Sequence, residues 1–503
     1  MTRDPRTAER RNMMKKSILV FCLGVLVAGA ASAELDTLWI RTYGGPGNDG
    51  FRSAIPTADG GALAVGYTHS MGPADVNVFA VRTDADGDTL WARAYGGAGM
   101  DYGYGVCEAH GGGYIITGYT TSFGAGAEDV YLIKIDSDGD TVWTRTYGGS
   151  EPDEGLSVCA TSDGQYAVSG RTDSYGSGYC DLYLLKVDGA GDTAWTRVYG
   201  DSLYDWGQSV CETGDGNIGI CGSKWGDSDN MDIYVLKVTP SGSLVWDDTY
   251  GDTGSINPDW GNWVIARSDT EMVVATFRAI EGRDPLDAGF LRVSLDGASL
   301  GYRRYISSYY QRCNSICMTP EDGFMLCGYD KEPTYQTNDL LLIKRVPGSG
   351  WVWEQTFGGA GSDWGNSIVH LGGGYYLVSG QTGSTPAGDY DAWLLMLKEP
   401  EAGVPAGSRK AELPHLAVPG PNPVSASTTV RFDLPEAMGV QVAVYDVSGR
   451  MVALLARGHL EAGAHASMWD GNNLEGRPVG PGVYLVTLSA GEYTATRKAV
   501  VLK

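Results

Sequence analysis

Two repeated groups of acidic side chains have the clearest chemical potential in this sequence. In the first group acids alternate with other residues, which is the carboxylate spacing of a calcium-binding loop. Its members are Asp84, Asp86 and Asp88 in one copy and Asp136, Asp138 and Asp140 in the next. Later copies read TPSGS and VPGSG and keep no carboxylate. A glycine turn tolerates that loss and a cation site does not, so we expect a turn, with calcium at the first two copies as the alternative.

The second group is an acid that recurs once per repeat and is often followed by an aromatic residue. The acids are Asp49, Asp101, Asp153, Asp205, Asp259 and Asp363, with Gln311 at the sixth position. The aromatic followers are Tyr102, Trp206, Trp260 and Trp364. A ring beside a carboxylate offers a sugar or peptide a stacking face and a hydrogen-bond acceptor. An acid that many copies need alike is explained more simply as a cap on backbone amides, so a scaffold role is favoured for the acid.

Further candidate ligand residues lie where the repeat is irregular. The stretch YISSYYQRCNS brings aromatic and arginine side chains towards the same rim, and the connections at 224–232, 277–289 and 330–339 are irregular too. Loops on one face of a rigid scaffold commonly carry binding residues, although drift in a decaying repeat gives the same irregularity. The ligand-binding hypothesis names Trp206, Trp260, Trp364, Tyr102, Tyr309, Tyr310 and Arg312.

Catalytic residues are not predicted. None of the six histidines pairs with a serine or cysteine in a nucleophile motif, and no CxxC or Cys/His metal spacing occurs. Paired carboxylates for glycoside hydrolysis remain the alternative, because acids are abundant. An enzyme should show a deep funnel with converging, unrepeated acids, whereas a binding protein should show an aromatic rim.

The elements that must position these residues come from a long repeat. Its anchor is a tryptophan that recurs about every 52 residues, as expected of a repeat architecture. The anchors are Trp39, Trp91, Trp143, Trp195, Trp246 and Trp353, with Tyr302 in place of one tryptophan. In the second unit, alternation broken by Gly/Asp turns predicts strands at 103–110, 113–120, 129–136 and 140–147. Seven such units indicate an all-β, seven-bladed β-propeller over residues 34–398.

Ring closure is predicted from the two ends of the array. A fourth-strand segment stands alone at Asp36 to Tyr43, and the last unit supplies only three strands before Lys398. The N-terminal strand should therefore complete the last blade and remove an exposed sheet edge. The order of Asp, Tyr and Trp within a unit loosely resembles kelch and quinoprotein blades, although the kelch double glycine is missing.

Residues 1–33 have the layout of a signal peptide. Basic residues precede the apolar run SILVFCLGVLVAGA, and the small residues Ala31-Ser32-Ala33 follow it. Export to the cell exterior is expected, with no membrane span in the mature chain, because no other run reaches about 18 apolar residues. The net charge of −24 argues against nucleic acid and anionic membrane as partners, because both need a positively charged surface.

Cysteine pairing is left open by the sequence. Cys211 and Cys221, and likewise Cys317 and Cys327, flank a hairpin turn. Each pair could form a disulfide in an exported protein. The favoured interpretation is that these cysteines fill tight inner strands as small apolar residues.

A second domain follows a Pro, Gly and charge-rich linker at 399–419. Residues 420–503 predict six or seven short strands in a small immunoglobulin-like β-sandwich. The segments TTVRFDLPE, VAVYDVSGR, Trp469-Asp470-Gly471 and GPGVYLVTLSAGEY resemble the C-terminal sorting domains of type IX secretion substrates and the related immunoglobulin-like domain of flagellar hook-capping (FlgD-like) proteins. The insertion NNLEGRPVGPGVY favours the hook-capping form. The resemblance implies a Gram-negative bacterium, contact with secretion machinery and a place at the outer cell surface.

The sequence therefore predicts an exported, non-catalytic binding or adhesion protein. Its partner would be carbohydrate or protein at the cell surface, held on one face of the propeller. The alternative is a secreted polysaccharide hydrolase or lyase with its site in the propeller funnel.

Overall fold

The computed structural model describes residues 35–501 with internal gaps. The gaps are 227–229, 252–257, 281–282, 307–309, 332–336, 360, 385–388, 401–414, 418–427, 435–436, 447–448, 462 and 491–492. The expected signal peptide and most of the expected linker lie outside the described residues. Within the described part of the chain, no helix is long and apolar enough to cross a membrane.

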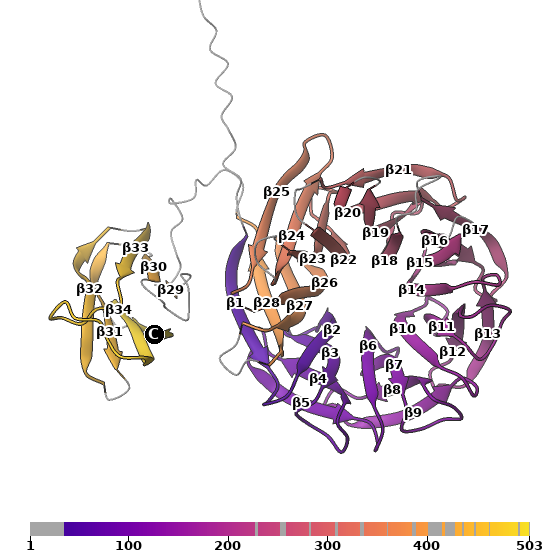
Figure 1. Cartoon of the computed structure of the whole chain (residues 1–503), viewed down its shortest axis with the longest axis horizontal. Helices are drawn as coiled ribbons and strands as arrows, with labels where there is room; N and C mark the ends of the chain where they lie inside the picture. Colours follow the sequence, from indigo (N-terminus) through magenta and orange to yellow (C-terminus); the bar gives the residue numbers. More distant parts are fainter. Residues whose placement is uncertain are drawn as a thin grey trace, which may run out of the picture. The chain divides into compact units, whose positions relative to one another are not determined.

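Seven four-stranded antiparallel sheets, here called blades 1 to 7, form a ring (Figure 1). Blade 1 holds β2 (Asp49–Pro56), β3 (Ala62–Thr68), β4 (Asn77–Thr83) and β5 (Thr89–Tyr95), and blade 2 holds β6 (Asp101–Glu108), β7 (Tyr114–Thr120), β8 (Asp129–Ile135) and β9 (Thr141–Tyr147). Blade 3 holds β10 (Asp153–Ala160), β11 (Tyr166–Thr172), β12 (Asp181–Val187) and β13 (Thr193–Tyr199), and blade 4 holds β14 (Asp205–Glu212), β15 (Ile218–Gly226), β16 (Asn230–Val238) and β17 (Leu244–Tyr250). Blade 5 holds β18 (Asp259–Arg267), β19 (Glu271–Ile280), β20 (Arg283–Ser294) and β21 (Ser299–Arg304), and blade 6 holds β22 (Tyr310–Met318), β23 (Phe324–Lys331), β24 (Asn338–Val346) and β25 (Gly350–Phe357). Blade 7 combines β26 (Asp363–Gly372), β27 (Tyr375–Thr382) and β28 (Asp391–Lys398) with β1 (Asp36–Tyr43). We call the strands of each blade a to d from the ring centre outwards.

The N-terminal strand closes the ring, as predicted. β1 pairs antiparallel with β28, from Asp36 opposite Lys398 to Tyr43 opposite Ala392. Blade 6 fastens the start of this strand, because the Gln355 side chain accepts a hydrogen bond from the backbone N–H of Leu35 (2.8 Å). The seven-bladed propeller is therefore confirmed.

The anchor tryptophans join neighbouring blades on the outer wall, which is formed by the d strands and the c–d turns. The indole of Trp91 donates to the carbonyl of Ser137 in the next blade (3.0 Å), and Trp143 donates likewise to Gly189 (3.2 Å). The hydroxyl of Tyr95 donates to the carbonyl of Gly139 in the same turn (2.7 Å). The same bond recurs at Trp39, Trp195 and Trp246, which explains the fixed spacing of these five tryptophans.

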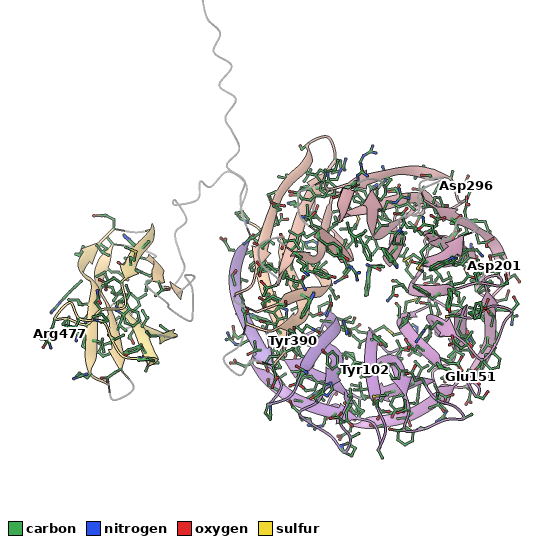
Figure 2. All side chains as sticks on the ribbon, viewed as in Figure 1. Tyr102, Glu151, Asp201, Asp296, Tyr390 and Arg477 are labelled. Atoms are coloured by element: carbon green, nitrogen blue, oxygen red, sulfur yellow. The ribbon has the colours of Figure 1, made fainter. Side chains whose placement is uncertain are left out.

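Apolar side chains fill the spaces between blades, and the centre of the ring stays open (Figure 2). All seven residues of strand b in blade 1 and of strand b in blade 2 are buried. One core cluster joins Leu63 and Val65 of blade 1 to Ile116 and Ile133 of blade 2. Each such side chain contributes about 1.5–3 kcal/mol when fully buried, so the blades stabilise one another.

The described cysteines are free thiols. Cys221 lies opposite Ser209, and Cys211 lies opposite Gly219, so the two cysteines do not face each other across the hairpin. The same offset separates Cys317, which lies opposite Met325, from Cys327. The disulfide alternative is therefore not realised here, and the inner-strand packing interpretation fits the burial of Cys221 and Cys327.

The C-terminal domain, described by itself, is a sandwich of two sheets around one core. One sheet holds β29 (His415–Ala417), β30 (Thr428–Leu434) and β33 (Gly463–Trp469). The other holds β32 (Met451–Leu460), β31 (Met438–Asp446), β34 (Gly482–Ala490) and β35 (Tyr493–Val501). Phe432 and Trp469 of the first sheet pack in the same core cluster as Val442 and Leu488 of the second. The predicted β-sandwich is thus confirmed.

Candidate functional site

A bulge in the innermost strand of every blade aims one side chain at the ring centre. In blade 2, Gly103 pairs with Gly118 and Gly105 with Thr117, so Tyr104 has no partner on strand b. A β-bulge of this kind leaves one residue out of the ladder and re-aims its side chain. The seven bulge residues are Arg52, Tyr104, Leu156, Gln208, Asn262, Asn314 and Asn366.

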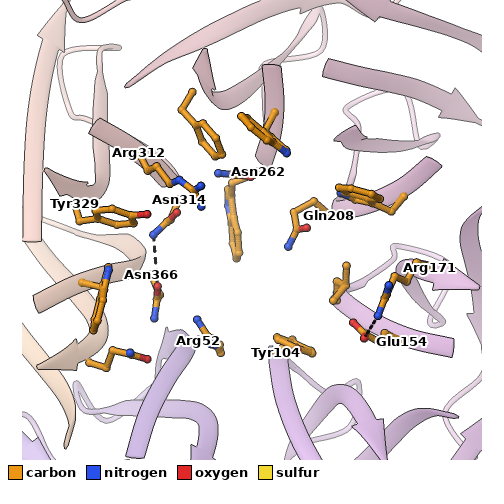
Figure 3. Close-up of a pocket in the computed structure, with 17 residues that line it drawn as sticks. Arg52, Tyr104, Glu154, Arg171, Gln208, Asn262, Arg312, Asn314, Tyr329 and Asn366 are labelled. Atoms are coloured by element: carbon orange, nitrogen blue, oxygen red, sulfur yellow. Dashed lines mark hydrogen bonds and ion pairs between the residues drawn. The ribbon is translucent and has the colours of Figure 1, made fainter. Parts of the chain in front are cut away.

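All seven bulge residues line one cavity of roughly 650 Å³ at the ring centre (Figure 3). In six blades the strand b residue beside the bulge is a glycine, and blade 5 has Thr276 there. The approach is close, because a Cβ on Gly118 would lie 1.7 Å from the carbonyl oxygen of Tyr102. The equivalent distance at Gly170, from the carbonyl oxygen of Glu154, is 1.8 Å. A glycine inside a strand often marks such a close backbone approach.

The residue after each repeated acid supplies a second ring of side chains. Glu154, Trp206, Trp260, Arg312 and Trp364 hold this position and line the cavity. Each pairs across the sheet with a strand b residue, and the Trp260 ring stacks on its partner Phe277 with centroids 4.5 Å apart. The Trp206 ring contacts no other aromatic ring among the described residues.

The repeated acids themselves are buried caps. Asp101 is fully buried and accepts hydrogen bonds from the backbone N–H of Gly97 (2.9 Å) and from the hydroxyl of Ser122 (2.7 Å). Asp153 makes the same two bonds, with Gly149 and Ser174. The scaffold interpretation of these acids is confirmed, and in blades 3 to 7 the residue after this position reaches the cavity.

The structure brings four of the seven predicted ligand residues together. Trp206, Trp260, Trp364 and Arg312 line the cavity. Tyr102 stacks on Tyr119 (5.1 Å between centroids) and is not among the lining residues.

The other two predicted ligand residues precede Arg312 in the chain. The hydroxyl of Tyr310 accepts a hydrogen bond from Arg312 Nε (3.1 Å), so this tyrosine supports the lining without being part of it. Tyr309 lies outside the described residues.

Two arcs of the cavity wall differ in how their bulge residues are used. The side-chain amides of Asn262, Asn314 and Asn366 donate to the carbonyls of Cys313 (2.7 Å), Gly365 (2.8 Å) and Phe51 (2.8 Å) in the next blade. This asparagine arc, in blades 5 to 7, therefore belongs partly to the scaffold. The bulge residues of blades 1 to 4 make no such inter-blade bond among the described residues, and we call them the open arc.

Charged residues in the cavity wall are three arginines and one glutamate. Arg171 Nη2 lies 2.5 Å from Glu154 Oε1, so these two charges compensate each other (Figure 3). Behind them, burial and the negative charge of Glu154 raise the pKa of the Glu128 carboxyl. Arg52 and Arg312 complete the set of charged lining residues.

The candidate calcium residues form turns. Asp84 Oδ1 accepts hydrogen bonds from the backbone N–H groups of Asp86 (3.0 Å) and Asp88 (2.9 Å), and Asp136 does the same for Asp138 and Asp140. In the next blade Asp188 makes both bonds although Ala190 replaces the middle acid. Among the described residues no group of three or more His, Cys, Asp or Glu could hold a metal ion. The geometry fits the favoured turn interpretation.

An aromatic platform, formed by Tyr179, Tyr204 and Trp225, was not predicted. Tyr179 is 70% exposed, and its ring stacks on that of Tyr204 with centroids 5.4 Å apart and planes 15° apart. Trp225 lies beside Tyr204 at 6.2 Å. The two tyrosines stand in the b–c connection of blade 3 and in the connection from blade 3 to blade 4, so the platform is on the face where these loops meet.

Comparison with known proteins identifies the C-terminal domain. Residues 424–493 match the family described as FlgD Ig-like domain, which confirms the resemblance of this domain to hook-capping immunoglobulin-like domains. The regulatory protein FlaEY of Caulobacter vibrioides is 32% identical over 84 residues, which cover 14% of this chain and 9% of FlaEY. The chain thus spans less than a tenth of that relative.

Among solved structures, PorZ of Porphyromonas gingivalis, described as a surface component of the type IX secretion system, is 11% identical with a TM-score of 0.39. That match covers 92% of this chain and 60% of PorZ. A puromycin hydrolase is 13% identical with a TM-score of 0.46, over 77% of this chain and 59% of the hydrolase. Likenesses of this degree carry no argument about function.

Proposed function

We propose that this protein is an exported, non-catalytic glycan-binding protein whose site is the central cavity of the propeller. The observation that carries the proposal is the composition of the cavity wall: Trp206, Trp260 and Trp364 supply flat apolar faces, and Gln208 supplies an amide. Aromatic faces together with a few convergent polar groups suit a sugar, which has apolar C–H faces and a rim of hydroxyls. The exposed Tyr179–Tyr204 stack adds a second surface of the same chemistry.

Binding is favoured over hydrolysis by the acids of the wall. Glycoside hydrolysis by two carboxylates needs both groups to face the scissile bond. Among the described residues that line the cavity, Glu154 is the single carboxylate, and Arg171 holds it in an ion pair. The repeated acids that might have supplied a partner are buried caps.

The C-terminal domain supports export to the cell surface. Its match to the FlgD Ig-like family, together with its resemblance to type IX sorting domains, favours a protein that works outside the cell and contacts secretion machinery through residues 420–503. Deleting those residues should retain the protein in the periplasm. Normal arrival of the truncated chain at the surface would remove the sorting role.

A glycan array tests the proposed function directly. The purified protein should bind a defined set of glycans, and Trp206→Ala should reduce that binding about five- to thirtyfold, because loss of the indole face on which the sugar stacks costs about 1–2 kcal/mol. Phe123→Ala is the matched control, since Phe123 is an aromatic residue 46% exposed outside the cavity wall. Equal loss in both variants, or no glycan binding by the wild-type protein, would contradict the proposal.

A further inference from the structure

The cavity is positively charged within a strongly acidic protein. The chain carries a net charge of −24. Of its charged residues, Arg52, Arg171 and Arg312 line the cavity and are opposed there by Glu154 alone. Since Arg171 and Glu154 compensate each other, two guanidinium groups remain.

Elsewhere the propeller pairs its buried cations closely. Lys186 is almost fully buried and lies 2.5 Å from Asp163, and Lys237 lies 2.9 Å from Asp215. Lys344 has Glu399 at 2.6 Å. Burying a charge without a partner is costly, and this scaffold avoids that cost with acids from its turns. A guanidinium that lines the cavity without an acidic partner therefore differs from these buried lysines.

Arg52 and Arg312 are half-buried and lack such an acidic partner among the described residues. Neither has an ion pair with a described acid. Nε of Arg52 is buried and has no hydrogen-bond acceptor, while its guanidinium lies over the Tyr67 ring at 5.5 Å. Arg312 uses Nε to bind the Tyr310 hydroxyl and lies over Phe277 at 4.7 Å. Its two terminal nitrogens have no acceptor among the described residues.

Both arginines are held in place and aimed at one side of the cavity. The aromatic contacts fix each guanidinium by cation–π attraction, which lowers the entropy cost of binding a ligand. Figure 3 shows Arg312 and Arg52 on the same side of the cavity, with Asn314 and Asn366 between them. The asparagines each use an amide hydrogen for a bond to the neighbouring blade, so the charged donors on this side belong to the arginines.

We infer that the cavity selects glycans that carry carboxylate groups, with Arg52 and Arg312 as the residues that bind uronic acid carboxylates. This inference rests on the proposed glycan-binding function and adds the charge of the ligand. Arginine binds a carboxylate through two parallel, charge-assisted hydrogen bonds, and two arginines on one side suit two acidic sugars of one chain. The tryptophans of the same wall favour a glycan over an acidic peptide, because they offer stacking faces beside the charges.

Matched probes test the inference by calorimetry on the whole protein. A galacturonic acid trimer should bind at least about tenfold more tightly than its methyl ester, which has the same rings without the charges. The affinity for the acid should fall as salt is raised, because ionic attraction is screened. Equal affinity for the two trimers would overturn the inference and leave the proposed function standing.

Two variants locate the effect. Arg52→Gln and Arg312→Gln should each weaken binding of the acidic trimer about tenfold or more and leave the ester unchanged. Arg52→Lys and Arg312→Lys keep the charge but lose the planar fork, so they should fall between wild type and Gln. Arg93→Gln, on the exposed outer wall, is the control and should bind as wild type does, with equal thermal unfolding in all variants.

Two further outcomes would count against the inference. Undiminished binding of the acidic trimer by folded Arg52→Gln and Arg312→Gln proteins would overturn it. Binding of a pentaglutamate peptide that depends on both arginines, without binding of the acidic trimer, would replace the glycan by an acidic peptide. Failure of every glycan, on the array as well as here, would instead defeat the proposed function itself.

Discussion

The outer and inner walls of the propeller use the same repeat in opposite ways. On the outer wall, the tryptophan of strand d makes one contact again and again, as Trp91 does with Ser137 and Trp143 with Gly189. On the inner wall, the bulge position changes from arginine to tyrosine, leucine, glutamine and asparagine around the ring. The recurrence of tryptophan on strand d reflects a contact between blades. The bulge residues make no contact that all blades share, so their identity can vary.

The contrast extends to single steps along strand a. Asp101 is fully buried and caps backbone amides, Tyr102 packs in an aromatic cluster, and Tyr104, at the bulge, faces the cavity. Scaffold and site therefore share one strand. A binding specificity can change at the bulge without disturbing the ring, because the bulge residue is outside the hydrogen-bonded ladder.

Removing the strand that closes the outer wall should have the largest effect. Deleting residues 35–43 leaves β28 with an unpaired edge and exposes its apolar side chains. We expect loss of cooperative unfolding and aggregation, measured by thermal denaturation and size-exclusion chromatography. A sharp transition at the wild-type temperature would show that closure is dispensable.

The next effect compares a tryptophan of the outer wall with a leucine of the inner wall. Trp143→Ala removes a packed ring and its bond to Gly189, so it should lower the free energy of unfolding by about 2–3 kcal/mol. Leu156→Ala, facing the cavity, should cost less than about 1 kcal/mol. Chemical denaturation measures both. Equal costs would contradict the division between the two walls.

The sequence predicted the fold more completely than the candidate site. The lone strand Asp36–Tyr43 predicted ring closure correctly, because a repeat that starts with its last strand has one simple way to complete itself. Trp206, Trp260 and Trp364 were found as cavity residues because they follow a conspicuous acid position. Arg312 was found because it stands in an irregular stretch of the repeat.

The bulge residues could not be placed in the same way. Alternation along strand a gives no sign of an extra residue, because a bulge is defined by the register of the partner strand. The strand b glycines, such as Gly118, were the available signal, since their missing Cβ admits the carbonyl of Tyr102. Tyr179 and Tyr204 stack on each other from two different loops. No periodic pattern in the sequence indicates such a contact.

Blade 1 differs from the other blades at a position near the start of strand c. The other six blades have an aspartate there, as blade 2 has Asp129. The structure has Asn77 at the equivalent position, opposite Thr68 as Asp129 is opposite Thr120. Asn77 is buried and donates to the carbonyls of Met71 and Ala74 (both 2.9 Å). Both side chains hold the preceding loop. The Asn77 amide donates to backbone carbonyls, whereas the Asp129 carboxylate accepts from backbone N–H groups.

Smaller effects on stability and on glycan binding should distinguish the asparagine arc from the open arc. Asn314→Ala breaks the bond to Gly365 and should lower the free energy of unfolding by about 1 kcal/mol. Gln208→Ala, in the open arc, should leave stability within about 0.5 kcal/mol and weaken glycan binding. Paired denaturation and binding curves check this. A stable Asn314→Ala protein beside a destabilised Gln208→Ala protein would reverse the assignment.

The smallest expected effect concerns the turns of the outer wall. Asp84→Ala loses two hydrogen bonds to backbone N–H groups and should cost about 1 kcal/mol. Asp86→Ala should be nearly neutral, because its backbone N–H supplies the turn contact and that group is retained. Calcium should leave the unfolding temperature of both proteins unchanged. A rise with calcium that Asp86→Ala abolishes would restore the metal hypothesis.

The central claim, that ligand is held by the inner wall, is tested most directly by hydroxyl-radical footprinting of the protein with and without the galacturonic acid trimer at saturation. We expect bound trimer to slow the oxidation of Trp206, Trp260 and Trp364 and to leave the oxidation of Trp91 and Trp143 on the outer wall unchanged. Protection confined to the outer wall, or bound trimer without protection of any cavity tryptophan, would contradict this claim.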